Sequence, residues 1–75
     1  MIEIWSKPQC PFCDKAENLC KQKNFEYQNY MLDVDFTREQ MFEKFPSART
    51  FPQITVNGEL IGGYTEFEAK VRSEE

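Results

Sequence analysis

Residues 7–20 read KPQCPFCDKAENLC, and they join a Cys-Pro-x-Cys motif to a run with helical spacing. Apolar side chains recur on one face of that run, at Ala16, Leu19 and Cys20. Proline is tolerated in the first turn of a helix, so Pro11 fits the start of such an element. The stretch therefore predicts a helix over residues 11–23, with both cysteines of the motif at its beginning.

The positions of Cys10 and Cys13 suit thiol chemistry. Positions i and i+3 of a helix are neighbours, and their Cα atoms fall within disulfide range. Cys10 would sit at the helix cap, where free backbone N–H groups and the helix dipole stabilise a thiolate and make it the nucleophile. Cys13, one turn further on, would be less exposed and suited to attack a mixed disulfide formed by Cys10.

Two further roles for these cysteines stay open at this point. They can be small buried hydrophobic residues, which is common for free cysteine. They can also be part of a metal or iron–sulfur site, although the chain has no histidine and only Cys20 in addition. One chain thus offers no four-ligand cysteine/histidine site and we predict no metal, while a cluster shared by two chains remains possible. Cys20 lies about 10.5 Å along the helix from Cys13, too far for a disulfide, and is predicted to be a core residue.

Length and composition indicate a single domain over residues 1–75, with eleven aromatic side chains available for a small core. The formal charge is −4 and no basic stripe is present, so we expect no nucleic-acid partner. Residues 1–24 carry four lysines against three acids, whereas residues 25–48 carry five acids against two bases. The surroundings of Cys10 therefore suit a small anionic substrate.

The sequence also bears on location. No stretch reaches the ~18 apolar residues that a membrane span needs, and the N-terminal residues lack a signal-peptide core. Three cysteines are an odd number for a secreted disulfide framework. We therefore expect a cytoplasmic protein without a membrane partner.

Strands are predicted in three other parts of the sequence. Residues 2–5 form a short apolar strand, and residues 25–32 alternate apolar and polar side chains. The apolar or aromatic positions of this second strand are Phe25, Tyr27 and then Tyr30 to Leu32, and one face of the strand would lie in the core. Residues 53–63 read as a hairpin, because Asn57-Gly58 supplies the positive φ angles of a tight type I′ turn.

Capping patterns predict the two remaining helices. Thr37 and Gln40 have the spacing of a capping box, and the helix that they begin would end at Pro46. Its inward residues would be Met41, Phe42 and Phe45, with Phe36 and Met41 spaced as a hydrophobic staple. Thr65 and Glu68 repeat the capping-box spacing before a last helix. Phe67 and Val71 would be its inward residues, and the predicted order of elements is β-α-β-α-β-β-α.

Four separated pieces of the sequence resemble one family. They are KPQCPFC (7–13), TFPQI (50–54), NGELIGG (57–63) and GGYTEF (62–67). In this order and spacing they resemble a dithiol glutaredoxin of the short bacterial and phage type, over essentially the whole chain. The resemblance implies an α/β, thioredoxin-like fold with a four-stranded mixed sheet flanked by helices. It also implies a cis peptide bond before Pro52.

The resemblance further implies a glutathione-dependent thiol–disulfide oxidoreductase. Cys10 and Cys13 would be its catalytic residues and form its redox-active disulfide. Glutathione would be the reducing co-substrate, and no cofactor would be tightly bound. The enzyme would be a monomer that acts on disulfide-containing or glutathionylated proteins, with ribonucleotide reductase as one candidate.

Glutathione binding is implied at residues that match the family's motifs. They are Lys7, Phe12, Phe51, Pro52, Gly63, Tyr64, Thr65 and Glu66. The Phe51 backbone would pair with the cysteine of glutathione, Lys7 would take the glycyl carboxylate, and Thr65 would take the γ-glutamyl carboxylate at a helix N-terminus. The chain departs from the family's usual residues at Phe12 for tyrosine, Phe51 for valine and Glu66 for aspartate.

Three alternatives to this function follow from the sequence. The first is a glutaredoxin-like redoxin that thioredoxin reductase reduces. The second is an iron–sulfur cluster carrier. The third is a thioredoxin-fold adaptor without turnover, in which Cys10 would be dispensable.

Overall fold

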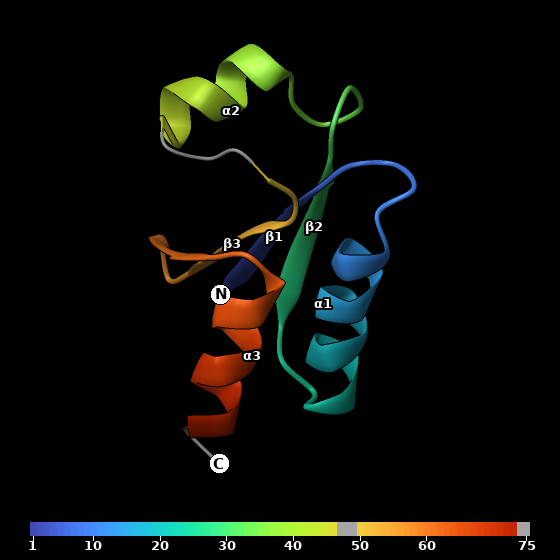
Figure 1. The fold of residues 1–75 in the computed structure, drawn as a ribbon, viewed down its shortest axis with the longest axis vertical. Coiled ribbons are helices and arrows are strands. Elements are labelled where there is room, and N and C mark those ends of the chain that lie inside the picture. Colours follow the sequence, from blue (N-terminus) through green and yellow to red (C-terminus); the bar gives the residue numbers. More distant parts are fainter. Residues whose placement is uncertain (47–49, 74–75) are drawn as a thin grey trace.

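A computed structural model describes residues 1–46 and 50–73, and within them four strands form a mixed sheet with three helices around it (Figure 1). The elements in chain order are β1 (Ile2–Ser6), α1 (Pro11–Gln22), β2 (Tyr27–Met31), α2 (Arg38–Lys44), β3 (Gln53–Val56), β4 (Glu59–Gly62) and α3 (Tyr64–Ser73). This order and the mixed sheet confirm the predicted thioredoxin-like fold class.

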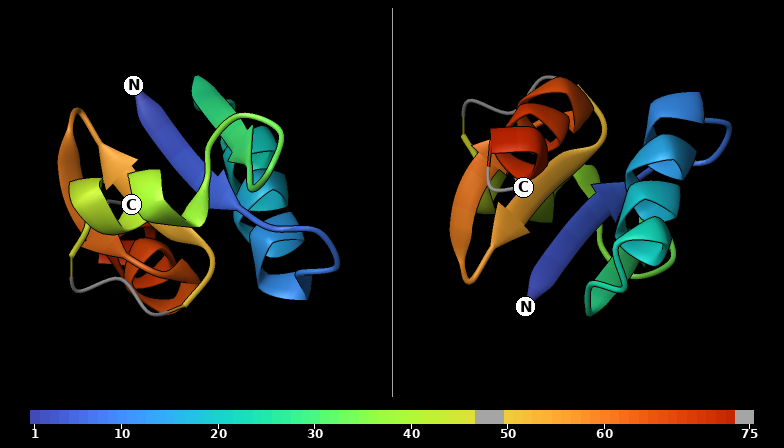
Figure 2. Two further views of the ribbon diagram at one scale, coloured as in Figure 1. Left: turned by 90° about the horizontal axis from the view of Figure 1, so that it is seen from above. Right: turned by 90° about the horizontal axis from the view of Figure 1, so that it is seen from below.

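The sheet has the strand order β2-β1-β3-β4. β1 is parallel to β2 and antiparallel to β3, and β3 is antiparallel to β4. The turn between β3 and β4 has φ 53° at Asn57 and φ 85° at Gly58, which confirms the predicted hairpin. In the views along the long axis, the strands are twisted relative to one another (Figure 2).

Helices α1 and α3 lie side by side against one face of the sheet (Figures 1 and 2). The main core cluster forms between them and the central strands, and its buried members are Ile2, Ile4, Ala16, Cys20, Ile54, Phe67 and Val71. Cys20, Phe67 and Val71 therefore face the core, as the helical spacing predicted.

Helix α2 lies beyond one end of the sheet and closes a second core cluster (Figure 1). This cluster buries Leu32, Phe36, Met41 and Phe45, with Trp5, Tyr30 and Phe51 packed against it. Because side chains alternate along a strand, Trp5 points away from the face that Ile4 covers. Its ring lies 4.6 Å from that of Tyr30 and 5.1 Å from that of Phe36, measured between centroids. The two clusters thus pack on opposite faces of β1.

The capping box of α2 is present as predicted. The Thr37 hydroxyl accepts a hydrogen bond from the backbone N–H of Gln40 at 3.2 Å, and the Gln40 side chain accepts one from the N–H of Thr37 at 2.8 Å. The predicted inward position of Phe42 is wrong, because its side chain is 50% exposed. Met41 and Phe45, four apart on one face, already fill the second cluster, and Phe42 lies about 100° away around the helix.

The prediction for Phe25 is also wrong. Pairing of β1 with β2 begins at Ile2 and Tyr27, so Phe25 lies before the strand, where its side chain is 37% exposed. Its backbone N–H instead donates to the carbonyl of Cys20 at 2.9 Å, which closes the turn after α1.

Candidate functional site

Cys10 and Cys13 form a disulfide at the start of α1, with their Cα atoms 5.2 Å apart. Cys10 is the N-cap, with an extended backbone of φ −120° and ψ 99°, and its Sγ accepts a hydrogen bond from the Cys13 N–H at 3.2 Å. The predicted capping position of Cys10 is therefore confirmed. The residues are 7% and 4% exposed, so the predicted difference in burial exists but is small.

Sheet pairing brings the cis-proline to the same end of the sheet as the loop that leads to this disulfide. Trp5 near the end of β1 pairs with Gln53 at the start of β3. The loop that leads to Cys10 and the segment around Pro52 therefore leave the sheet at the same end of these two central strands. The peptide bond between Phe51 and Pro52 is cis, as predicted. The Gln53 side chain donates to the Thr50 carbonyl oxygen at 2.7 Å and so ties down the residues before the proline.

The end of β4 completes the same region. Gly62 pairs with Ile54, which places the following turn beside Pro52. A Cβ on Gly63 would lie 3.4 Å from the Pro52 carbonyl oxygen, so the two backbones approach closely. Three separated parts of the sequence, the start of α1 at Phe12, the segment at Pro52 and the turn after β4, thereby meet at one end of the sheet.

A groove of about 500 Å³ lies where these parts meet. Its lining residues are Phe12, Thr50, Phe51, Pro52, Gly63, Tyr64, Thr65 and Glu66. Seven of these eight were predicted as site residues, and the structure brings them together. Thr50 was missed as a site residue, although it begins the TFPQI motif.

Two lysines lie beside aromatic rings of this groove. The Nζ of Lys7 lies 5.9 Å from the centroid of the Phe51 ring, which places the predicted carboxylate anchor next to the groove although it does not line it. Lys15, which the sequence did not single out, has its Nζ 5.0 Å from the Phe12 ring centroid. Positive charges therefore lie beside two of the aromatic rings that line the groove.

The start of α3 differs from the sequence prediction. The Gly63 carbonyl accepts from the Phe67 N–H at 3.0 Å, and the Glu66 carboxylate accepts from the Gly63 N–H at 3.2 Å. Gly63 rather than Thr65 is therefore the capping residue, and the helix begins at Tyr64, two residues earlier than a cap at Thr65 predicts. Glycine is an accepted N-cap, and the spacing from Gly63 to Glu66 was the signal for it.

Glu68, the other half of the predicted cap, has different partners. Its carboxylate accepts a hydrogen bond from the Tyr64 hydroxyl at 2.6 Å and lies 3.6 Å from the Arg72 side chain. This hydrogen bond, with burial as a second cause, raises the pKa of Tyr64 above its ordinary value. The Tyr64 ring lies 6.0 Å from the Phe12 ring, centroid to centroid, so this network supports one wall of the groove.

Cys20 is a free, fully buried thiol in the main core cluster, as predicted. Burial, with a smaller effect of the nearby Glu17 carboxylate, raises the pKa of Cys20 to about 11. In residues 1–46 and 50–73 no three His, Cys, Asp or Glu side chains come together as a metal site. No helix in this part of the chain has the length and apolar character of a membrane span.

Comparison with known proteins gives a consistent result. The glutaredoxin family model matches residues 2–61. A probable glutaredoxin of Synechocystis sp. is 39% identical over 69 residues, which cover 91% of this chain and 78% of that protein. Glutaredoxin 3 of Escherichia coli is 29% identical over 68 residues, which cover 91% and 82%. The crystal structure of a buckwheat glutaredoxin–glutathione complex matches with a TM-score of 0.83 at 25% identity, covering 97% of this chain and 69% of that one.

Proposed function

The chain belongs to the glutaredoxin family of thiol–disulfide oxidoreductases, and on that premise we propose that it reduces disulfides at the expense of glutathione. The observation that carries the proposal is the groove of about 500 Å³ lined by Phe12, the residue that lies between Pro11 and Cys13 in the motif of the Cys10–Cys13 disulfide. A related buckwheat protein forms a complex with glutathione, which supports the same ligand here.

We assign the groove to glutathione because positive features near the groove match the two carboxylates of this ligand. The tripeptide carries two carboxylates, and the groove has an ammonium group near Phe51 and the N-terminus of α3 near Thr65. We propose that Lys7 binds the glycyl carboxylate and that the first turn of α3 binds the γ-glutamyl carboxylate. The Phe51 backbone beside Pro52 would pair with the central cysteine, while Phe12 and Tyr64 would form the wall.

The proposed reaction has two halves. In the first, the Cys10 thiolate attacks one sulfur of the substrate disulfide, and the other sulfur leaves as a thiolate that takes up a proton. The Cys13 thiolate then attacks the Cys10 sulfur, which releases the second substrate thiol and leaves the Cys10–Cys13 disulfide. The hydrogen bond from the Cys13 N–H and the helix N-terminus favour the anionic sulfur that Cys10 needs for its initial attack on the substrate.

Glutathione would complete the cycle in the second half. One glutathione thiolate attacks Cys10 and displaces the Cys13 thiolate. A second glutathione thiolate then attacks the glutathionyl sulfur, so that glutathione disulfide leaves and Cys10 returns to its reduced form. Both electrons that reduce the substrate thus come from two glutathione molecules.

Turnover of a glutathione mixed disulfide tests this proposal. We expect NADPH to be consumed when the protein, glutathione, glutathione reductase and the mixed disulfide of glutathione with 2-mercaptoethanol are combined. Omission of glutathione should stop the reaction. If thioredoxin reductase instead sustains NADPH consumption without glutathione, the chain is a thioredoxin-reductase-dependent redoxin. Visible absorbance and dimerisation on addition of iron and sulfide would favour a cluster carrier.

Serine variants of the two cysteines test their roles. Cys10→Ser should abolish activity with every disulfide, because it removes the attacking sulfur. Cys13→Ser should retain reduction of the glutathione mixed disulfide and lose reduction of a protein disulfide, since only the latter needs a resolving thiol. Equal loss of both activities in Cys13→Ser would contradict these roles, and full activity of Cys10→Ser would favour the adaptor function.

The physiological substrates are part of the same proposal. Oxidised ribonucleotide reductase is the protein substrate to assay first, and formation of its dithiol form by the reduced protein is the measurement. The proposed monomer can be checked by sedimentation under the assay conditions. We place the reaction in the cytoplasm, where glutathione keeps thiols reduced.

A further inference from the structure

A second hollow lies between α1 and α3, outside the groove that we assign to glutathione. This interhelical cleft has a volume of about 700 Å³. The two helices run side by side in the same direction (Figure 1), and each contributes side chains spaced four residues apart. They include Lys15, Leu19 and Lys23 from α1 and its C-cap, and Tyr64, Glu68 and Arg72 from α3. Val71 also lines the cleft and is buried, while Leu19 is half-buried, so part of the lining is apolar.

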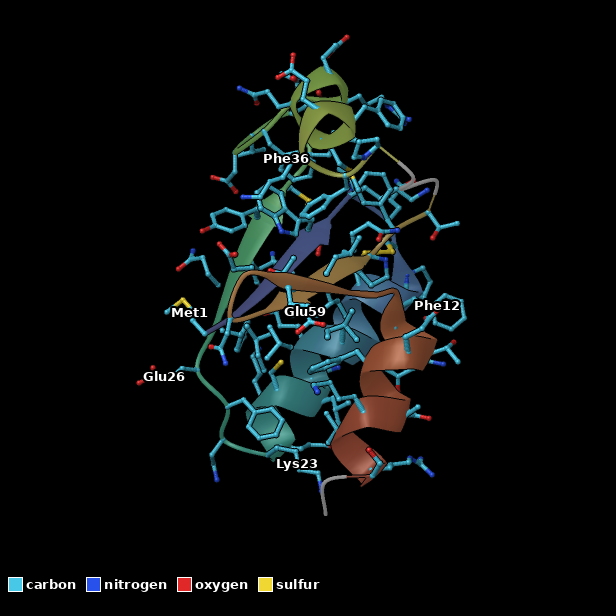
Figure 3. The ribbon with its side chains drawn as sticks, turned by 90° about the vertical axis from the view of Figure 1, so that its left-hand side faces the viewer. Met1, Phe12, Lys23, Glu26, Phe36 and Glu59 are labelled. Atoms are coloured by element: carbon cyan, nitrogen blue, oxygen red, sulfur yellow. A yellow bond between two sulfur atoms is a disulfide. The ribbon has the colours of Figure 1, made fainter. Side chains whose placement is uncertain are left out.

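The interhelical cleft begins at one wall of the groove. Tyr64 lines both of them. Lys15 lines the cleft, and its Nζ lies 5.0 Å from the ring centroid of Phe12, which lines the groove. Lys23 lies at the other end of α1 from Phe12 (Figure 3). A ligand that fills the groove can therefore continue past Phe12 and Tyr64 into the cleft.

The charge in the interhelical cleft is mostly positive. Within residues 1–46 and 50–73, its charged lining residues are Lys15, Lys23, Arg72 and Glu68. The Glu68 carboxylate already accepts a hydrogen bond from the Tyr64 hydroxyl at 2.6 Å and lies 3.6 Å from the Arg72 side chain. The chain as a whole has a formal charge of −4. The cleft is therefore a local site of positive charge on an acidic protein, and it suits acidic side chains of a partner.

The length of the cleft sets the size of the ligand. Lys15 and Lys23 are eight residues apart, or about 12 Å along the helix axis. An extended peptide rises about 3.3 Å per residue, so about four residues span that distance. Cys10 precedes Lys15 by about 7.5 Å, or about two more extended residues. A peptide cysteine joined to Cys10 would thus place the residues about two to six positions away along the cleft.

The proposed orientation of glutathione gives the direction of such a peptide. The γ-glutamyl end, which precedes the cysteine of glutathione, would lie at the first turn of α3 beside Tyr64. The glycyl end would lie at Lys7. In a longer substrate, the residues before the cysteine therefore extend toward the interhelical cleft.

We propose that the interhelical cleft binds an extended acidic segment of a protein disulfide substrate, on the N-terminal side of the cysteine that Cys10 attacks. This inference rests on the proposed function and names the class of its protein substrate. The chemistry is unchanged: the Cys10 and Cys13 thiols become a disulfide, and the substrate disulfide becomes two thiols. A mixed disulfide of glutathione with a small thiol has no segment that reaches the cleft.

Single turnover of peptide disulfides tests the inference without glutathione. The protein is reduced, freed of reductant and mixed with the symmetric disulfide of a short peptide, and the released peptide thiol is measured by chromatography after an acid quench. One peptide carries glutamates and a central leucine at the positions given above, before its cysteine. A second has glutamine for each glutamate, and a third carries the acidic run after its cysteine. We expect the first to react about tenfold faster than the others at low salt, as a few exposed ion pairs together allow. Added salt should reduce the difference.

Two lysine variants show whether this preference comes from the interhelical cleft. Lys21 lies about 200° around the helix from Lys23, and it forms an ion pair of 3.4 Å with Glu17 outside the cleft. Lys23→Gln should lower the preference for the acidic peptide by about twofold, the effect of one exposed ion pair. Lys21→Gln changes the net charge equally and should leave the preference unchanged. Both variants should keep the wild-type rate with the mixed disulfide of glutathione and 2-mercaptoethanol.

Each contrary result is distinct. Equal rates for the acidic and neutral peptides in the wild type would overturn the inference, and so would equal rates for acidic runs before and after the cysteine. An equal loss of preference in the two lysine variants would assign the preference to net charge and would also overturn it. Failure of the proposed function looks different, because the cycle driven by glutathione and glutathione reductase would then not turn over. The single-turnover rates would still decide whether the cleft binds acidic segments.

Discussion

Cys20 lies on the same helix as Cys13, two turns further on, but its thiol is in a different environment. It is fully buried in the main core cluster, and burial with the nearby Glu17 raises its pKa from 9.0 to about 11. The folded protein therefore holds the thiol proton to a higher pH than the unfolded chain does. Its contribution to stability is complete below pH 9 and is lost as the pH rises toward 11.

This environment predicts a pH effect on stability. In the oxidised protein, the free energy of unfolding should fall between about pH 9 and about pH 11, and more steeply in the wild type than in Cys20→Ala. Urea unfolding across that range measures both slopes. All other titratable groups are present in both proteins, so the difference between the slopes isolates Cys20. Equal slopes would contradict the assigned cause.

Individual residues could be predicted from sequence where their role depends on local spacing. The core position of Cys20 follows from helical periodicity, and the cap at Cys10 follows from its place before Pro11. The exposure of Phe25 could not be predicted in this way. It depends on where β1 begins to pair with β2, which is a contact between distant parts of the chain.

At the level of elements, the start of α2 and the start of α3 are capped differently. Thr37 makes both hydrogen bonds of a capping box with Gln40. Thr65 lies inside the first turn of α3, where Gly63 has the capping position. The same residue type therefore has a structural role in one helix and not in the other.

A pair of threonine variants tests this difference. Thr37→Ala should lower the free energy of unfolding by about 1 kcal/mol, the usual cost of removing a capping hydroxyl. Thr65→Ala should lower it by far less, because alanine is the better helix former at a position inside a helix. Chemical denaturation of the two variants beside the wild type is the measurement. Equal losses would show that Thr65 also caps its helix.

The two capping predictions also show how far local spacing can predict where a helix begins. Thr37–Gln40, Gly63–Glu66 and Thr65–Glu68 all have the spacing of a cap residue and its N3 partner. Only the first and second are used. The choice at α3 is made by the end of β4, because the pairing of Gly62 with Ile54 fixes where the chain can turn into a helix. Local spacing does not contain that information.

At the level of the whole molecule, one sheet supports two core clusters and one groove. The main cluster anchors α1 and α3, and the second anchors α2. The groove residues come from the start of α1, the segment before β3 and the start of α3. Composition and periodicity do not show that these segments meet. The family resemblance predicted it because the same motifs accompany this fold.

A pair of phenylalanine variants tests the effect of the unequal burial of two rings on stability. Phe67 is 1% exposed, whereas Phe42 is 50% exposed. Phe67→Ala should cost about 3–5 kcal/mol, which is a large part of the ~4–11 kcal/mol expected for a domain of this length. Phe42→Ala should cost less than about 1 kcal/mol. Urea midpoints give both values, and comparable losses would contradict the unequal burial of the two rings.

Trp5 gives the molecule a built-in optical probe. It is the only tryptophan in the sequence, and its ring contacts Tyr30, Phe36 and Phe45 in the second cluster. The Nζ of Lys44 from α2 lies 4.8 Å from the centroid of the same indole. Ultraviolet emission excited at the indole band thus reports on the α2 side of the sheet, while circular dichroism in the far ultraviolet follows all the helices. Recorded together, the two signals reveal whether α2 detaches before the rest of the molecule melts.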